Sequence, residues 1–515
     1  MKAWAIVGCA VVGTIVMAVV YKNRTAPVPI CRNCNIVMIS ADEFRADDLP
    51  CYGYDRNTAP NICAFARANT YFTNYYSASS YTYDDYVTQM TGLYPSTHHV
   101  IFPVADMLDP AAPALPKLLQ SRGYKTVYVG ITSNLNVPLY VGANNGFDEV
   151  HTNWFSRTLS PWFEKLLPDL TSGKPTFLYF YSYMLHDPYL PGSGPRRYVE
   201  GNFSLPVTQS QYEVSSLPFY SFVLSDFESR MKAGYTIENI NRNAAIVKSL
   251  GDAIEAGDLS RAHTIFLTQC TADEQGWYYA LWYRHNTDPK NPAMVSYLHG
   301  LYDEQINALD RDLTPLFDFL KRPDVRRRTI VIITSDHADE FAEHGFLYHE
   351  NNVYNTSTHV PFIIAVPGIH QGAVNTLSGS ADLFPTLLNL LGMTPPAQTD
   401  GVSLVPSLLG EKQLDTRYVL SEHRATAIQS ITDGDWKFYI DRTVASSPVY
   451  ELYNLVSDPG EQHNLASAYP AVRKRLNTAL RQIVDGAPKY TPVVNGFPGW
   501  IDGTLRQRLI QTGYF

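Results

Sequence analysis

The stretch from Thr329 to His337 constrains the fold more than any other part of this chain. Its first six residues, TIVIIT, are all β-branched and show no alternation of polar and apolar side chains. Such a run is typical of a strand that is buried on both faces of a parallel sheet. Asp336 and His337 follow the carboxyl end of this predicted strand, which is where open α/β sheets bind ligands. Together they offer an oxygen donor and a nitrogen donor to a divalent cation.

Acidic residues follow a second predicted strand near the start of the chain. Residues 35–40 (NIVMIS) form another short apolar run, and Asp42 and Glu43 come just after it. Because the carboxyl ends of parallel strands lie at the same edge of a sheet, side chains from distant parts of the chain can surround one cation there. The two segments together therefore predict a metal site at the edge of an α/β sheet.

Length and charge narrow the class of protein. The chain has 515 residues, a formal net charge of −9 at pH 7 and a pI near 5.9. It is long enough to bury a large core. A nucleic-acid-binding protein would need a basic face, so we expect no nucleic-acid partner. The 35 tyrosines would suit a cleft that contacts polar organic molecules.

The first residues predict a membrane segment. Residues 3–21 carry no charge, and Lys2, Lys22 and Arg24 flank them. A secretory apolar region is usually shorter, so we expect residues 1–28 to be an N-terminal anchor or signal-anchor. The catalytic body would then be exported to a periplasmic, extracellular or lumenal compartment. Both flanks are positive, which leaves the membrane orientation open.

The chain has six cysteines, which permit disulfides if the body is exported. The pair Cys31 and Cys34 has the spacing of a zinc half-site, but no second C-x-x-C exists to complete it. We therefore expect this pair to be structural or idle.

Several motifs occur in the order in which sulfatases carry them. They are NIVMISADEFRADDLPCYGYDRNTAPNICAFA (35–66), TGLYP (91–95), LHDPY (185–189), TSDHADEFAEHG (334–345), HVPFII (359–364), ADLFPTLL (381–388) and ELYNL (451–455). The chain thereby resembles the sulfatase family, within the alkaline-phosphatase superfamily, over about residues 35–200 and 296–470.

This resemblance implies a fold and a domain organisation. The fold would be an alkaline-phosphatase/sulfatase-like α/β/α sandwich with a largely parallel central sheet and a smaller C-terminal antiparallel sheet. We expect a catalytic domain at 35–410, with a variable insertion at about 200–295, and a C-terminal subdomain at 411–515.

The nucleophile departs from the family pattern. In sulfatases the reactive residue is a Cys or Ser within C/S-x-P-S-R that is oxidised to formylglycine. The residue nine positions before Thr91 is Thr82, and Asp84, Asp85 and Tyr86 replace Pro, Ser and Arg. Threonine cannot become formylglycine, whereas phosphodiesterases and phosphoryl transferases of the superfamily use a Thr at this place. The resemblance therefore implies a metal-activated Thr82 nucleophile; the alternative is a Thr that only caps the following helix.

The resemblance also implies one divalent cation. Members with two zinc ions carry a D-x-x-x-H segment upstream of the late Asp-His pair. Here the nearest candidates begin at Asp303 and Asp310, and neither supplies the His. The carboxylates favour calcium, magnesium or manganese, and the imidazole favours manganese or zinc, so the metal is undecided. The expected ligands are Asp42, Thr82, Asp336 and His337, with Glu43 as a fifth.

Three more residues would contact the substrate. His186 matches the substrate-contacting His of the family. His349 matches the Lys or His that touches the transferred group or protonates the leaving group, a task that suits imidazole. Arg45 could bind an oxyanion with its fork of donors, although in D-x-x-R turns it more often braces the loop.

The sequence therefore predicts a metal-dependent hydrolase that acts on a sulfate or phosphate ester, with phosphoester hydrolysis or phosphoryl transfer favoured. The substrate would be a small-molecule, glycan or lipid ester. One alternative is a sulfuric ester hydrolase that uses Thr82 or activated water. Another is a catalytically inactive member that binds an anion or glycan.

Overall fold

The computed structural model describes most of the chain. The described residues are 31–100, 106–130, 146–152, 158–190, 196–200, 203, 216–232, 237–270, 272–349, 352–411, 417–423, 427–444, 446–487, 490–491 and 493–494.

Eight strands form the central sheet: β1 (Asn35–Ala41), β2 (Thr70–Phe72), β5 (Lys125–Gly130), β6 (Glu149–Thr152), β7 (Thr176–Ser182), β8 (Thr329–Thr334), β11 (Phe362–Ala365) and β12 (Gly372–Val374). Their order is β12-β2-β11-β8-β1-β7-β5-β6. Strand β11 runs antiparallel to β8 and β2, and the other pairs are parallel. The two strands that end in acidic residues, β1 and β8, are direct neighbours with Asn35 opposite Thr329. The predicted, largely parallel sheet is confirmed.

Helices cover both faces of this sheet because its strands are apolar on both sides. All seven residues of β1 are buried, with Val37 and Ile39 in one core layer and Ile36 and Met38 in the other. The first layer is covered by α2 (Pro60–Arg67), α7 (Ser160–Leu166), α12 (Pro292–Asp312), α13 (Thr314–Leu320) and α14 (Pro323–Arg326). The second layer is covered by α3 (Thr82–Thr91), α5 (Leu115–Ser121), α16 (Leu383–Leu390) and α17 (Val405–Leu408). The predicted α/β/α sandwich is thus observed.

The described chain also contains short helices and strands. They are η1 (Pro50–Tyr52), β3 (Tyr75–Tyr76), α4 (Pro95–His98), β4 (Asp106–Met107), η2 (Leu167–Thr171), β9 (Glu340–Phe341), β10 (Leu347–Tyr348), α15 (Asn355–Thr358), β13 (Ser378–Gly379), η3 (Ser380–Asp382) and β18 (Val493–Val494).

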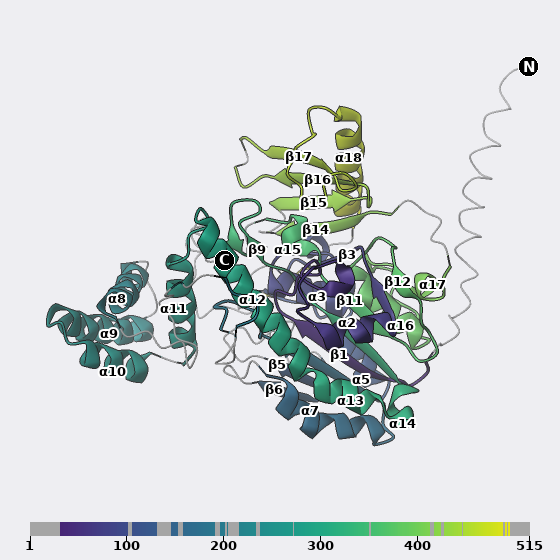
Figure 1. Cartoon of the computed structure of the whole chain (residues 1–515), viewed down its shortest axis with the longest axis horizontal. Coiled ribbons are helices and arrows are strands. Elements are labelled where there is room, and N and C mark those ends of the chain that lie inside the picture. The colour runs from purple at the N-terminus through teal and green to yellow at the C-terminus, as the bar shows by residue number, and fades with distance from the viewer. Residues whose placement is uncertain are drawn as a thin grey trace, which may run out of the picture.

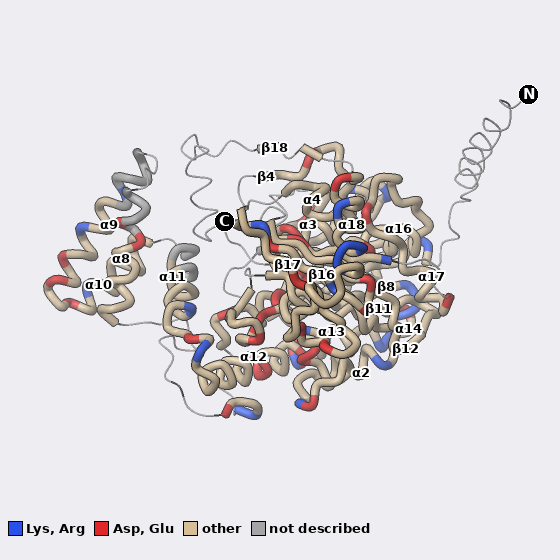
Figure 2. Tube along the Cα trace, turned by 90° about the horizontal axis from the view of Figure 1, so that it is seen from above, with Lys and Arg blue, Asp and Glu red and all other residues tan. Residues whose placement is uncertain are grey.

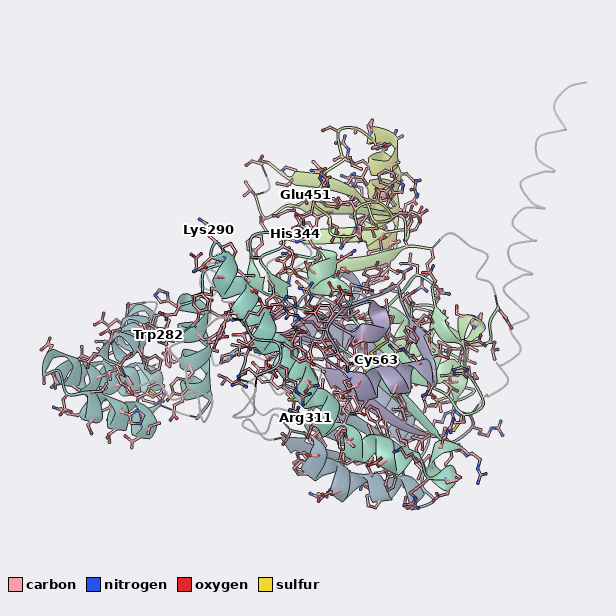
Figure 3. All side chains as sticks on the ribbon, viewed as in Figure 1. Cys63, Trp282, Lys290, Arg311, His344 and Glu451 are labelled. Atoms are coloured by element: carbon pink, nitrogen blue, oxygen red, sulfur yellow. A yellow bond between two sulfur atoms is a disulfide. The ribbon has the colours of Figure 1, made fainter. Side chains whose placement is uncertain are left out.

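A four-stranded antiparallel sheet follows the sandwich, as the resemblance implied. It consists of β14 (Val419–His423), β15 (Ile428–Thr432), β16 (Trp436–Asp441) and β17 (Val449–Asn454), and α18 (Pro470–Gly486) packs on it (Figure 1). Tyr354 joins this sheet to the sandwich. Its ring stacks on His344 at 3.8 Å and on Tyr439 at 4.8 Å, and its hydroxyl donates to Glu451 at 2.7 Å. Two of these partners, His344 and Glu451, are labelled in Figure 3.

A group of helices projects from the sandwich beside α12 (Figure 1). It comprises α8 (Leu217–Lys232), α9 (Ile237–Glu255), α10 (Leu259–Gln269) and α11 (Ala272–His285), and we call residues 217–285 the helical unit. Aromatic side chains pack its interior. Phe219 stacks on Tyr279 at 5.3 Å and meets Phe266 and Trp282 edge-on. Figure 3 labels Trp282 in this unit. The helical unit falls within the segment predicted as a variable insertion.

The predicted membrane-anchored, exported location needs correction. No helix among the described residues is both long enough and apolar enough to cross a membrane. Residues 1–28, which were expected to form the anchor, lie outside the described residues. The apolar run in the sequence is therefore unsupported as an anchor.

Four cysteines near the start of the described chain form two disulfides. These bonds join Cys31 to Cys34 and Cys51 to Cys63, so the first pair has the expected structural character. In the view of Figure 2, Lys and Arg are interspersed with Asp and Glu over the described part of the chain.

Candidate active site at the carboxyl edge of the sheet

Four of the predicted ligands meet where β1, β8 and α3 converge. Asp42 follows β1, Asp336 and His337 follow β8, and Thr82 is the first residue of α3. Nε2 of His337 lies 3.4 Å from Oδ1 of Asp42, 3.7 Å from Oδ2 of Asp336 and 3.2 Å from Oγ1 of Thr82. We call these four residues the carboxylate group. All of them are buried except Thr82, which is partly exposed.

The carboxylate group fits a divalent cation. Nδ1 of His337 faces the carbonyl oxygen of Ala338 at 3.4 Å, and this carbonyl can only accept. The Nε2 lone pair therefore points at two carboxylates, which is the arrangement of a metal-ligating His held by a backbone carbonyl. Oδ1 of Asp42 is buried and has no hydrogen-bond partner among the described residues.

The electrostatic environment of the carboxylate group also favours a bound cation. Burial, and then repulsion from Asp336, raises the pKa of Asp42 well above its usual value. Burial also lowers the pKa of His337, which favours its neutral form. Two buried carboxylates and a neutral imidazole that lie this close together carry no positive charge of their own to offset the carboxylates. A bound cation would supply this charge. Asp336 also accepts a 2.8 Å hydrogen bond from the hydroxyl of Tyr181.

Glu43 does not join the carboxylate group, although the sequence predicted it as a fifth ligand. Its backbone has φ +61°, in the left-handed region, and its carboxylate lies with His186, Asp187 and His349. Oε1 of Glu43 is 2.8 Å from Nδ1 of His349 and 3.2 Å from Nε2 of His186. Oε2 accepts from the backbone N–H of Asp187 at 3.1 Å. We call these four residues the histidine group.

The carboxylate group and the histidine group adjoin. The rings of His337 and His349 have centroids 4.5 Å apart, and the rings of His349 and His186 have centroids 5.2 Å apart. A row of imidazoles thus leads from Thr82 to His186. His186 stacks on Tyr183 at 4.0 Å, and both side chains are partly exposed. Burial lowers the pKa of His186 to about 3, so its ring is neutral in this arrangement.

Sequence reasoning missed two acidic residues that orient the histidines. Asp339 is fully buried; its carboxylate lies 3.1 Å from Nδ1 of His349 and accepts a hydrogen bond from Tyr189. Burial opposes ionisation of Asp339, but the hydrogen bond from His349 prevails and holds the pKa of Asp339 well below its usual range. Asp187, also buried, lies beside His186. Asp339 lies in an acidic stretch with Glu340 and Glu343, which is also typical of a solvent-exposed surface, and only its position two residues after His337 could have indicated a role in the site.

Arg45 braces its loop, the less demanding of its two predicted roles. Nε and Nη2 of Arg45 donate to Asp47 at 3.0 and 2.7 Å, and Nη1 donates to the Asp339 carbonyl oxygen and to Glu343 at 2.9 and 2.7 Å. The side chain is only 4% exposed. All three nitrogens of the guanidinium thus have protein partners.

The residues that replace the formylglycine motif are structural. Asp85 is fully buried and accepts from the backbone N–H of Ala78 at 2.6 Å and from Gln89 at 2.7 Å. Tyr86 packs edge-on against Tyr179 in the core at 5.7 Å. The N-cap of α3 is Tyr81, and no side-chain hydrogen bond caps this helix. The capping alternative for Thr82 therefore finds no support in the geometry.

The two segments considered for a second metal, which begin at Asp303 and Asp310, make other contacts. Asp303 pairs with Arg56 at 2.7 Å, and Asp310 accepts from the backbone N–H of Ile62 at 2.7 Å.

Known families and proteins resemble this chain. The family model described as sulfatase matches residues 34–393, and that of the N-sulphoglucosamine sulphohydrolase C-terminal region matches residues 342–485. Arylsulfatase K of Bos taurus is 29% identical over 232 residues, which cover 43% of this chain and 42% of that protein. Delta 4,5-hexuronate-2-O-sulfatase of Bacteroides thetaiotaomicron is 38% identical over 153 residues, 27% of this chain and 31% of that protein. These matches thus span less than half of either relative.

Solved structures share the fold. A 2-O GAG sulfatase superimposes with a TM-score of 0.60 at 20% identity and covers 88% of this chain and 92% of its own. The phosphonate monoester hydrolase of Agrobacterium radiobacter superimposes with a TM-score of 0.58 at 19% identity and covers 88% of this chain and 96% of its own.

Proposed function

The chain belongs to the sulfatase family of the alkaline-phosphatase superfamily, and from this premise we propose that it is a metal-dependent ester hydrolase with Thr82 as nucleophile. The observation that carries the proposal is the position of the Thr82 hydroxyl, 3.2 Å from Nε2 of His337 in the carboxylate group. We also propose that residues 35–410 form the catalytic domain and residues 411–515 a smaller subdomain.

Asp42, Asp336 and His337 would hold one divalent cation, and Thr82 would complete its ligands. When bound, the cation would lower the pKa of the Thr82 hydroxyl and would offset the negative charge that develops in the reaction. The choice of metal among calcium, magnesium, manganese and zinc stays open, because the donor set mixes carboxylates with an imidazole.

Thr82 would attack the phosphorus or sulfur atom of the ester. Oγ1 would lose its proton to solvent and form a bond to that atom, while the bond to the leaving oxygen breaks and that oxygen takes up a proton. A water molecule would later hydrolyse the threonine ester, which returns a proton to Oγ1 and releases phosphate or sulfate. The position of Thr82 at the start of α3 supports this role, because the N-terminus of a helix favours negative charge.

His349 and His186 would act on the other side of the substrate. The carboxylate of Asp339 orients His349 through Nδ1, as the carboxylate of a catalytic triad orients its imidazole. We assign proton donation to the leaving oxygen to His349. We assign a contact with the substrate to His186, which is partly exposed beside Tyr183.

The nature of the nucleophile favours a phosphate ester, because Thr82 cannot become formylglycine. A sulfate ester is the second candidate, and the names of the relatives support it: arylsulfatase K and delta 4,5-hexuronate-2-O-sulfatase. The second name, which specifies a hexuronate, favours a sugar ester over a lipid ester. A member that only binds an anion remains the alternative outside catalysis, and the ordered ligands of the carboxylate group count against it.

Turnover assays with the full chain test the proposal. Aryl phosphate monoesters, aryl phosphate diesters and an aryl sulfate are assayed with each of the four metals, for wild type and Thr82→Ala. We expect hydrolysis of at least one phosphate ester that depends on added metal and is lost in the variant. Hydrolysis of the sulfate alone would favour the second candidate, and anion binding without turnover would favour the inactive member.

A further inference from the structure

The helical unit, residues 217–285, reaches the active site through one side chain. Arg284, near the end of α11, makes a two-pronged ion pair with Asp187. Its Nη2 donates to Oδ1 of Asp187 at 2.7 Å, and its Nε lies 3.2 Å from Oδ1 and 3.1 Å from Oδ2. Such a planar fork on a carboxylate fixes both distance and orientation.

Asp187, which Arg284 holds in place, in turn contacts His186. Its carboxylate oxygen Oδ1 lies 3.4 Å from Nδ1 of His186, and its backbone carbonyl oxygen lies 2.7 Å from the same nitrogen. The Asp187 side chain is fully buried. A buried carboxylate that loses its positive partner is costly, so Asp187 would shift or capture another charge if Arg284 were absent. The nearest imidazole is that of His186.

Arg284 also contacts the residue that precedes His349. Its guanidinium lies over the ring of Tyr348, 5.1 Å from the centroid. The hydroxyl of Tyr348 donates at 2.9 Å to Thr287, which follows α11. The backbone of Tyr348 has φ +66°, a conformation that a bulky residue adopts only when its surroundings hold it there. One arginine thus touches the neighbours of both histidines.

We propose that Arg284 is a positioning residue through which the helical unit sets the orientation of His186 and His349. The inference rests on the proposed function, because it assigns Arg284 a role in a reaction that those histidines serve. The alternative is a purely structural tie that holds the helical unit to the sandwich. The two readings differ in what happens when the tie is cut: a structural tie affects stability, whereas a positioning residue affects turnover in a folded, metal-loaded protein.

The test compares four variants of the full, metal-loaded chain: Arg284→Gln, Arg284→Lys, Asp187→Asn and the double variant Asp187→Asn/Arg284→Gln. Arg261→Gln is the matched control, because it removes the same charge from an exposed position of the helical unit. His186→Ala gives the upper limit of the effect. For each protein we measure kcat, KM, bound metal, the thermal midpoint and, independently of turnover, the affinity for inorganic sulfate.

For Arg284→Gln we expect kcat to fall by about 10- to 100-fold, because small displacements of catalytic groups cost this much. KM should rise as sulfate affinity falls, whereas metal content and the thermal midpoint should change little. Sulfate affinity should fall in the same direction as for His186→Ala. Arg284→Lys should be intermediate, because it keeps the charge and loses the fork. The double variant should recover part of the activity, because the unpaired carboxylate is gone and the backbone carbonyl of Asp187 still fixes His186.

Two results would overturn the inference while leaving the proposed function intact. One is an active wild type with Arg284→Gln equal to Arg261→Gln in kcat and sulfate affinity. The other is a loss of activity that tracks a loss of metal or of the folded state and is not recovered in the double variant. A wild type that neither hydrolyses an ester nor binds sulfate would contradict the proposed function itself, and the inference with it.

Discussion

The hydroxyl of Thr82 lies 3.2 Å from Nε2 of His337, although 255 positions separate the two residues in the chain. A helix start and a strand end are thus brought together at one edge of the sheet. This contact places the only hydroxyl of the carboxylate group against its only imidazole. The first prediction tests what that hydroxyl does.

Replacement of Thr82 by Ala should abolish turnover and leave sulfate affinity nearly unchanged, because His186 and His349 remain. Thr82→Ser should keep part of the activity, because it retains the hydroxyl and loses one methyl group. Intact-mass analysis of quenched wild type should show one added phosphoryl group on the peptide that carries Thr82. Thr88→Ala is the control. Thr88 lies on the same helix, but its hydroxyl donates to a backbone carbonyl oxygen of that helix. Full activity in Thr82→Ala would exclude the nucleophile assignment.

Loss of either carboxylate should remove the metal. Asp42→Ala and Asp336→Ala are each expected to reduce the bound metal to background, as measured by elemental analysis. Asp324→Ala, on the exposed surface, should retain the wild-type stoichiometry. Chelation should also lower the thermal midpoint of wild type, because it leaves buried carboxylates uncompensated. Unchanged stoichiometry in both Asp42→Ala and Asp336→Ala would remove the basis of the metal site.

Replacement of Glu43 distinguishes its observed place in the histidine group from its predicted role as a metal ligand. If Glu43 belongs to the histidine group, Glu43→Gln should keep the metal and lower kcat, because it removes the charge that holds His186 and His349. We expect a fall of about 10-fold or more, as for other groups that orient catalytic residues. Metal content and kcat are measured on the same sample. A fall in metal stoichiometry comparable to that of Asp42→Ala would restore Glu43 as a direct ligand.

A buried histidine that is not among the proposed ligands, His98, should set part of the acid sensitivity. Nδ1 of His98 accepts from the backbone N–H of Val100 at 3.0 Å, and Nε2 faces Thr88 at 3.3 Å. Burial lowers the pKa of His98 from 6.5 to about 3. Because the unfolded chain binds this proton first, stability is retained above pH 6.5 and falls as the pH drops toward 3.

The loss from His98 alone amounts to about 2 kcal/mol at pH 5. Urea unfolding at pH 5 and pH 7.5 should show a smaller pH dependence for His98→Gln than for wild type. His370→Gln, at an exposed position, is the control and should follow wild type. Equal pH dependence in all three proteins would contradict the assignment.

The sandwich and the carboxylate group were accessible from the sequence because their signals are local. Apolar runs specify β1 and β8, and the residues just after them must lie at the same edge once the strands pair. The place of Glu43 was not accessible in this way. Adjacent residues at a strand end are expected to share a site, and only the backbone turn at φ +61° separates them.

The partners of the histidines could not be read from the sequence either. Arg284 comes from helices that the motifs do not cover, and its approach to Asp187 depends on how the helical unit packs. Asp339 is followed by Glu340 and Glu343, and such an acidic stretch is typical of an exposed surface. Where the sequence misled, it did so through composition: a long uncharged run suggested an anchor that the described structure does not support.

The succession of Asp42 and Glu43 has a consequence for how such an enzyme can diversify. A single peptide unit joins Asp42, whose side chain lies beside His337, to Glu43, whose side chain lies beside His349, so covalent geometry fixes the backbone distance between the carboxylate group and the histidine group. Loop exchange or domain movement cannot alter it. New substrates would therefore have to be accommodated by changes in other residues, such as Tyr183 and those of the helical unit. The backbone distance between the carboxylate group and the histidine group would stay the same.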